Sequence, residues 1–117
     1  MTGGGDVNFP DDENGDVFRR MQQSGFDFAL PHDVEFFAFF ATESDADACA
    51  MMFVADRTAG DPLVGIETRP SHRGGMELEL VRRMVLTHDA VTAFERLFRQ
   101  RADAHGGTLD GWGVLQA

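Results

Sequence analysis

A run of nine residues, HDVEFFAFF at positions 32–40, limits the folds open to this chain more than any other segment. It is short and aromatic, which favours a β-strand over a helix. Successive side chains of a strand point to opposite faces, so Phe36 and Phe40 lie on one face and Phe37 and Phe39 on the other. Because both faces are apolar, we expect this run to be a central strand of a sheet.

The segments around this strand alternate between helical and extended patterns. Apolar residues three and four apart mark helices, as from Ala46 to Val54, whereas alternation of apolar and polar residues marks strands. Residues 42–45 are candidates for the N-cap of the second helix, and Ser44 and Asp47 have the spacing of a capping box. Thr87 is the expected N-cap of the last helix. The expected elements are an opening helix ending at Gly25, a strand over 32–40, a helix ending near Gly60, strands over 62–68 and 76–86, a helix ending at Gly106, and a strand over 108–115.

After the opening helix, the order is strand, helix, strand, strand, helix, strand. This order is typical of the ferredoxin-like split βαβ sandwich, an α+β fold. We therefore expect a four-stranded antiparallel sheet with two helices on one face, plus an extra N-terminal helix. In the strand over 62–68, Val64 and Ile66 are expected on one side. The glycine-rich residues 1–9 are expected to form a flexible tail, and residues 10–117 a single domain.

The charge balance points towards a protein partner. Twenty acidic residues outnumber ten basic ones, all arginine, and give a formal net charge of -10. A surface of this sign repels a phosphate backbone, so we expect no direct binding of nucleic acid. It is compatible with a basic protein partner, and equally with solubility alone.

The residues that usually carry catalysis or bind cofactors form no recognisable motif. Cys49 lies on the expected buried stripe of a helix, and the serines lack a nucleophile-elbow context. The histidines lack metal-ligand spacing, the glycine runs lack a phosphate-loop frame, and the acidic opening lacks the downstream glutamate of a calcium loop. We predict no catalytic residue, cofactor or metal. The sequence shows no signal peptide or membrane span, which predicts a cytoplasmic protein without membrane contact.

The motif Asp110-Gly111-Trp112-Gly113 holds the chain's one tryptophan close to its end. In a strand, Asp110 and Trp112 would share one face, and the glycines would leave the other bare for close approach by a helix, a backbone or a bulge. We favour a packing role, in which Trp112 closes an edge of the core and the glycines relieve crowding. A binding hot spot is the alternative, because tryptophan is enriched in hot spots.

Three stretches together resemble the regulator of ribonuclease E activity B (RraB-like) family. The first is DDENGDVFRRMQQSGFDFALPHDVEFFAFF, the second is THDAVTAFERLFRQRADAHGGTLDGWG, and the third is the acidic helix between them. The matching features, in order, are Asp11 to Gly15, Ser24-Gly25, Pro31 with Asp33, Phe36-Phe37, Gly106-Gly107 and Asp110-Gly111-Trp112. The similarity begins at Pro10, whereas the segment over 60–86 carries few matching features.

The resemblance implies a small ferredoxin-like protein that binds an endoribonuclease of the ribonuclease E type and lowers its activity without touching RNA or catalysing a reaction. The candidate protein-binding residues are Asp11, Asp12, Glu13, Asp110 and Trp112. Two other classes stay open: a small-molecule binder or enzyme with a cleft near Trp112 and the histidines, and an acidic immunity or antitoxin-like protein. The helix-free sheet face is expected either to form a homodimer or to be covered by the opening helix.

Overall fold

The computed structural model describes residues 9–115 as seven elements around one antiparallel sheet. In chain order these are α1 (Glu13–Gln23), β1 (Pro31–Phe40), α2 (Glu43–Thr58), β2 (Leu63–Pro70), β3 (Met76–Val85), α3 (His88–Ala104) and β4 (Thr108–Val114). The strand order is β2-β3-β1-β4, which is the predicted ferredoxin-like arrangement. Of the expected tail over 1–9, only Phe9 is among the described residues.

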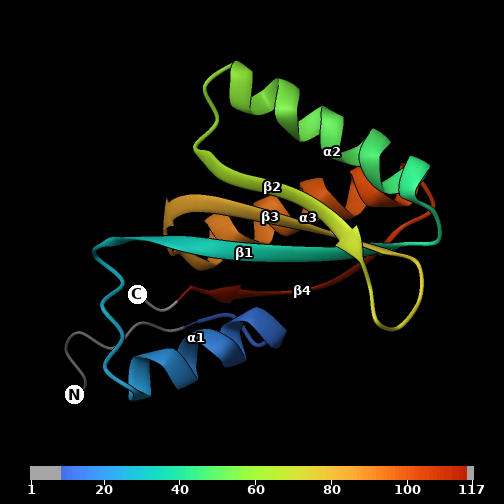
Figure 1. Ribbon diagram of the computed structural model, residues 1–117. Coiled ribbons are helices and arrows are strands. Elements are labelled where there is room, and N and C mark those ends of the chain that lie inside the picture. The colour runs from blue at the N-terminus through green and yellow to red at the C-terminus, as the bar shows by residue number, and fades with distance from the viewer. Residues whose placement is uncertain (1–8, 116–117) are drawn as a thin grey trace, which may run out of the picture.

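Strand β1 lies between β3 and β4 and has the two apolar faces that the sequence predicted. Val34, Phe36, Ala38 and Phe40 are buried beneath the helices, whereas Phe37 is half-buried on the other face. Figure 1 shows α3 behind the sheet and α2 along its β2 side. The core therefore lies between the sheet and these two helices.

The helices begin where short polar side chains can accept hydrogen bonds from free backbone N–H groups. The hydroxyl of Thr42 accepts from the N–H of Asp45 at 3.2 Å, and that of Thr87 accepts from the N–H of Ala90 at 3.0 Å. The cap of α3 is the predicted one. Helix α2 begins before Ser44, so the capping box with Asp47 does not form.

The extra helix α1 lies on the β4 side of the sheet, away from α2 (Figure 1). It packs beside α3, and it leaves the helix-free face of the sheet uncovered. Phe18 of α1 is fully buried and packs against Phe9, Phe28 and Trp112, with ring centroids 5.2–5.8 Å away. The aromatic rings around Phe18 thus extend the core around the edge of the sheet.

Two irregularities in strand pairing correct predictions made from simple alternation. The register of β2 shifts between Leu63 and Gly65, so Leu63 enters the core and Val64 is 55% exposed. Val64 and Ile66 therefore do not share a buried face. A second shift, opposite Phe37 and Ala38 of β1, makes Asp110 an extra residue in β4. A bulge of this kind reverses the alternation, so Asp110 and Trp112 do not share a face.

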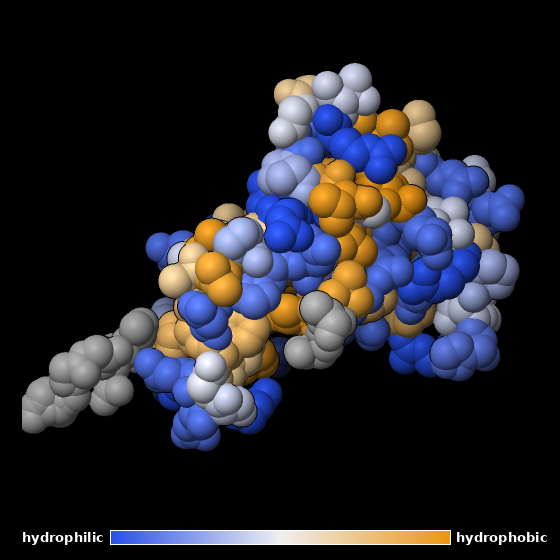
Figure 2. All heavy atoms as spheres, turned by 60° about the vertical axis from the view of Figure 1, so that its left-hand side comes forward, coloured by the Kyte–Doolittle hydropathy of each residue, from blue (hydrophilic) through white to orange (hydrophobic). Residues whose placement is uncertain are grey.

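The surface of the described residues mixes apolar and polar regions. Figure 2 shows hydrophobic residues in a band down the middle of that view, with hydrophilic residues on both sides. No helix within residues 9–115 is both long and apolar enough to cross a membrane.

Gly15 supplies a test of how α1 is held. A glycine inside a helix normally costs about 1 kcal/mol relative to alanine. Here, however, a Cβ at Gly15 would lie 1.7 Å from the carbonyl oxygen of Pro10, so the chain preceding the helix must move. We predict that Gly15→Ala lowers the free energy of unfolding by about 1–3 kcal/mol, the usual range for overpacking. Urea denaturation measures this, with Gln23→Ala, at an exposed position of the same helix, as the control.

A urea unfolding midpoint of Gly15→Ala equal to or above that of the wild type would contradict the close approach of Pro10 to α1.

Candidate protein-binding surfaces

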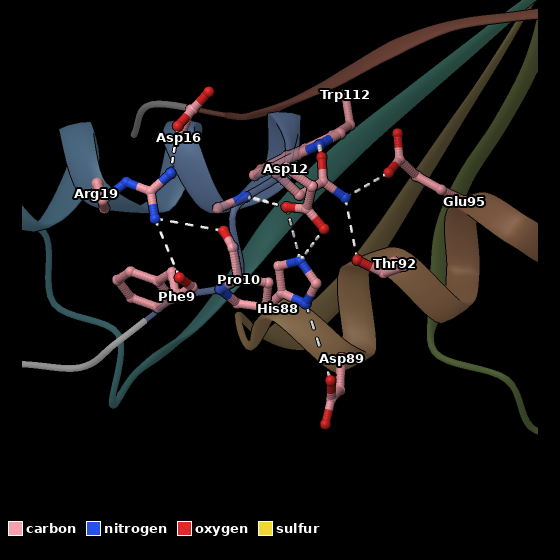
Figure 3. A network of polar contacts seen from close by, with 12 residues as sticks. Phe9, Pro10, Asp12, Asp16, Arg19, His88, Asp89, Thr92, Glu95 and Trp112 are labelled. Atoms are coloured by element: carbon pink, nitrogen blue, oxygen red, sulfur yellow. Dashed lines mark hydrogen bonds and ion pairs between the residues drawn. The ribbon is translucent and has the colours of Figure 1, made fainter.

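Trp112 is held in place by α1 and α3 (Figure 3). Its indole N–H donates to the side-chain oxygen of Asn14 at 2.9 Å, and its ring lies 5.8 Å from that of Phe18. The amide nitrogen of Asn14 in turn donates to Thr92 at 3.1 Å and to Glu95 at 2.6 Å, both on α3. Asn14 therefore joins three elements, and Trp112 has the packing role that its sequence context favoured.

The glycines beside Trp112 do not relieve crowding. A Cβ built on Gly111 or Gly113 meets no atom of the described residues within 4 Å. Gly111 has a φ of +152°, which few other residues adopt, and it sits at the bulge. The backbone conformation at Gly113 does not require a glycine, since its φ is not positive. Its bare backbone faces open space on the side of the sheet without helices.

Asp12 joins the start of α1 to the start of α3. Its carboxylate accepts from the N–H of Gly15 at 2.7 Å and from the Nε2 of His88 at 2.9 Å. The hydrogen bond from Gly15, followed by that from His88, outweighs desolvation and lowers the pKa of Asp12. The Nδ1 of His88 is buried without a hydrogen-bond partner among the described residues, 3.8 Å from Asp89.

The other acidic residues of this region differ in what they contact. Asp11 and Glu13 are exposed at the N-terminus of α1, where carboxylates interact favourably with the helix dipole. Asp16 pairs with Arg19, whose guanidinium also donates to the carbonyl oxygens of Phe9 and Pro10 (Figure 3). Asp11 and Glu13 are therefore exposed acidic candidates that form no ion pair with another described residue.

A hollow of about 480 Å³ lies beside this network. It is lined by Phe9, Pro10, Phe28, Leu86, Thr87, His88 and Asp89. A small-molecule site near Trp112 was expected to combine Asp110 with a histidine and an arginine, and the hollow contains neither Asp110 nor an arginine. Its wall is mainly apolar, with His88 and Asp89 as its ionisable side chains. Within residues 9–115, no three histidine, cysteine or acidic side chains gather to hold a metal ion.

Asp110 lies on the opposite side of the sheet, where it meets the loop between β2 and β3. Its carboxylate is 3.5 Å from the guanidinium of Arg73, which lies 4.0 Å above the ring centroid of Phe39. The five candidate residues thus fall into separate places: Asp11, Asp12 and Glu13 at the start of α1, Trp112 beneath α1, and Asp110 beside Arg73.

The helix-free side of the sheet, called the open face below, carries charges that sequence reasoning did not single out. Its side chains come from alternate positions of each strand, as the pairing requires: Glu67 and Arg69 on β2, Glu77, Glu79 and Val81 on β3, Glu35, Phe37 and Phe39 on β1, with Gly111 and Gly113 on β4. The guanidinium of Arg69 lies 2.8 Å from Glu67, 2.8 Å from Glu77 and 2.9 Å from Glu79.

Glu35 adds a fourth carboxyl to this group. A hydrogen bond with Glu79, then burial and the negative charge of Glu79, raise the pKa of Glu35 from 4.5 to about 7, although Arg69 opposes the shift. The same hydrogen bond lowers the pKa of Glu79. The two carboxyls therefore share one proton below about pH 7, and this proton is about half dissociated at neutral pH. We refer to Glu35, Glu67, Glu77 and Glu79 as the glutamate cluster.

Cys49 is buried in the core beneath α2, as predicted from its place on the apolar stripe of that helix. Burial raises the pKa of its thiol to about 11, so the thiol stays protonated at neutral pH. It is therefore unsuited to act as a nucleophile.

Comparison with known protein families identifies a matching family. The model of the family described as Regulator of ribonuclease activity B (RraB) matches residues 11–114, from the start of α1 to the end of β4. No curated protein matches the chain. The match covers both the segments that resemble the family in sequence and the segment over 60–86, which did not.

The Trp112–Asn14 contact predicts graded losses of stability. Trp112→Phe keeps a ring against Phe18 but leaves the oxygen of Asn14 without its donor, which costs about 1–2 kcal/mol. Trp112→Ala also removes the packing and costs about 2–4 kcal/mol in total. Urea unfolding measures both values. A loss below 0.5 kcal/mol for Trp112→Ala, roughly the size of a surface effect, would show that the indole does not hold β4 to α1.

The shared proton predicts a pH dependence. The folded pKa of Glu35 lies above its ordinary value, so its contribution to stability is fully present below about pH 4.5 and is lost as the pH rises through about 7. The Glu35→Gln variant has no carboxyl to ionise at this position, so its stability does not fall for this reason as the pH rises. Between pH 5 and pH 8 the melting temperature of the wild type should therefore fall more than that of Glu35→Gln. Glu67→Gln, at an exposed carboxyl of the same face, is the control and should follow the wild type.

Equal changes for wild type and Glu35→Gln across this pH range would contradict a proton shared with Glu79.

Proposed function

The chain belongs to the regulator of ribonuclease activity B family, and from this premise we propose that it binds an endoribonuclease of the ribonuclease E type and lowers its activity. The observation that carries the proposal is the extent of the family match, which includes α1, all four strands and both helices of the sandwich. The protein would act by occupying a surface of the enzyme, without catalysing a reaction, and would change RNA turnover in the cytoplasm.

The electrostatics of the chain support a protein partner over RNA. The formal net charge is -10, and the open face gathers four glutamates around one arginine. A phosphate backbone would be repelled by this surface, whereas a basic region of a protein would be attracted and steered to it. Binding of this kind weakens as salt screens the charges.

Some of the candidate protein-binding residues fit this role better than others. Asp11 and Glu13 are exposed beside the start of α1, and Asp110 is exposed next to Arg73. Trp112 and Asp12 are engaged in contacts between elements, so we expect them to affect binding through the position of α1.

A small-molecule binder is the second candidate, because the hollow beside His88 is apolar and has a buried imidazole nitrogen without a partner among the described residues. Apolar hollows with few polar groups are typical of small-molecule sites. The family match does not support this function, and an immunity or antitoxin-like role has no structural feature in its favour.

The proposed function predicts slower RNA cleavage. Purified protein is mixed with the ribonuclease E-type enzyme of its host and a labelled single-stranded RNA, at concentrations on the order of micromolar. We expect a stable complex and a cleavage rate at least several-fold lower. An unrelated ribonuclease with the same RNA is the control, and its rate should not change. The RNA alone should not bind the protein.

Absence of a complex together with an unchanged cleavage rate would contradict the proposed function. A reduced rate with the unrelated ribonuclease as well would show that the protein acts on the RNA.

A further inference from the structure

The open face is a sheet surface that no helix of the described residues covers. Helix α1, the one element that could have covered it, packs beside α3 instead. Gly111 and Gly113 leave the backbone of β4 bare on this side, because a Cβ at either position would meet nothing within 4 Å. Phe37, which pairs with Gly111 and with Glu79, keeps a half-buried ring in the middle of the face.

One part of this face already binds a cation from the chain itself. The guanidinium of Arg73 lies 4.0 Å above the ring of Phe39, and the carboxylate of Asp110 flanks it at 3.5 Å. An aromatic ring with an acidic neighbour is a favourable site for a guanidinium, since the ring attracts the cation and the carboxylate forms an ion pair with it. The pairing of Arg73 shows that this part of the face accommodates a guanidinium.

Phe37 lies two residues earlier in the same strand and has the same kind of surroundings. Glu79 is its partner across β3, and Glu35 is its neighbour along β1 on the same face. Among the described residues, no arginine lies over the ring of Phe37 as Arg73 lies over Phe39. Phe37 thus has acidic neighbours in Glu35 and Glu79, as Arg73 has Asp110 beside it over Phe39, but no guanidinium of the described residues lies over the Phe37 ring.

The charge balance around Phe37 indicates that a partner on this face would be positively charged. The four carboxyls of the glutamate cluster have one guanidinium, Arg69, among them. The remaining arginines of this face have partners of their own, Arg83 with Asp33 at 3.0 Å and Arg73 with Asp110. Negative charge is therefore in excess here, and two copies of this face would repel each other.

We propose that the open face is the docking surface for a basic segment of the endoribonuclease, with an arginine or lysine over Phe37 between Glu35 and Glu79. This deepens the proposed function and depends on it, because the partner is the same enzyme. The backbone of the segment would lie along Gly111 and Gly113, where the lack of side chains permits close approach. The homodimer that the helix-free face suggested is disfavoured on this face by its charge.

Proton exchange follows from the same arrangement. A cation beside Glu35 and Glu79 favours the form in which both are ionised, so docking releases the proton that they share. The charged groups that face Glu35 are Glu77 and Glu79 on β3 and Arg69 on β2, whereas β4 contributes the uncharged Gly113. Affinity should therefore rise between pH 6 and pH 8, around the pKa of about 7 of Glu35.

Binding of the full-length chain to the ribonuclease E-type enzyme tests the proposal, by titration calorimetry and by RNA cleavage. The double variant Glu35→Gln, Glu79→Gln should weaken binding tenfold or more and abolish the rise in affinity with pH. Glu43→Gln together with Asp103→Asn, at two exposed carboxylates on the helices, also replaces two acidic side chains and should change affinity less than twofold.

A second variant blocks the face without changing its charge. Gly113→Trp fits the fold, since nothing lies within 4 Å of a Cβ there, but it places an indole where the segment would lie. It should weaken binding tenfold or more while circular dichroism and the melting temperature stay close to those of the wild type. Ala104→Trp, at an exposed position of α3, is its control.

The outcomes separate the two proposals. If the wild type binds and inhibits, and the open-face variants do so equally well, the docking surface lies elsewhere while the proposed function stands. If the wild type does not bind the enzyme at all, both proposals are overturned. Loss of binding in the open-face variants, with both controls unaffected, supports the docking surface.

Discussion

The structure depends on the way β1 divides its side chains between two faces. Val34, Phe36, Ala38 and Phe40 point into the space beneath α2 and α3, and their burial supplies much of the apolar contact that holds the sandwich together. Because β1 pairs with both β3 and β4, the same alternation sets which residues of those strands face the core. The same alternation sets which side chains lie on the open face, where half-buried phenylalanines stand among glutamates. The residues of the open face are therefore fixed once those of the core are.

The extra helix is joined to this sandwich by specific contacts at the β4 edge. Trp112 donates to Asn14, Asn14 donates to α3, and Asp12 accepts from His88, so three parts of the chain meet in one network. Phe18 fills the space between them. The tryptophan near the end of the chain therefore holds α1 in place, and Asp11 and Glu13 are exposed at the start of this helix.

Periodicity predicted the elements, their order and the central place of β1, because these depend on patterns within short segments. It failed where a residue was set by strand pairing or by close approach. The bulges that expose Val64 and separate Asp110 from Trp112 exist only in relation to the partner strand. Likewise the close approach of the Pro10 carbonyl to Gly15, which disfavours a larger residue there, cannot be located from the sequence. The glutamate cluster was missed for the same reason: Glu35 and Glu79 are far apart in the chain, and only the register brings them together.

The proposed regulatory contact uses the open face. Nuclear magnetic resonance of the labelled protein, titrated with the ribonuclease E-type enzyme, reports on it directly through the backbone amide signals of each strand and helix. The largest changes should fall on Glu35, Phe37, Gly111 and Gly113, with α2 and α3 little affected. Changes confined to α2 and α3, with the signals of the open face unmoved in a complex that inhibits cleavage, would contradict the claim.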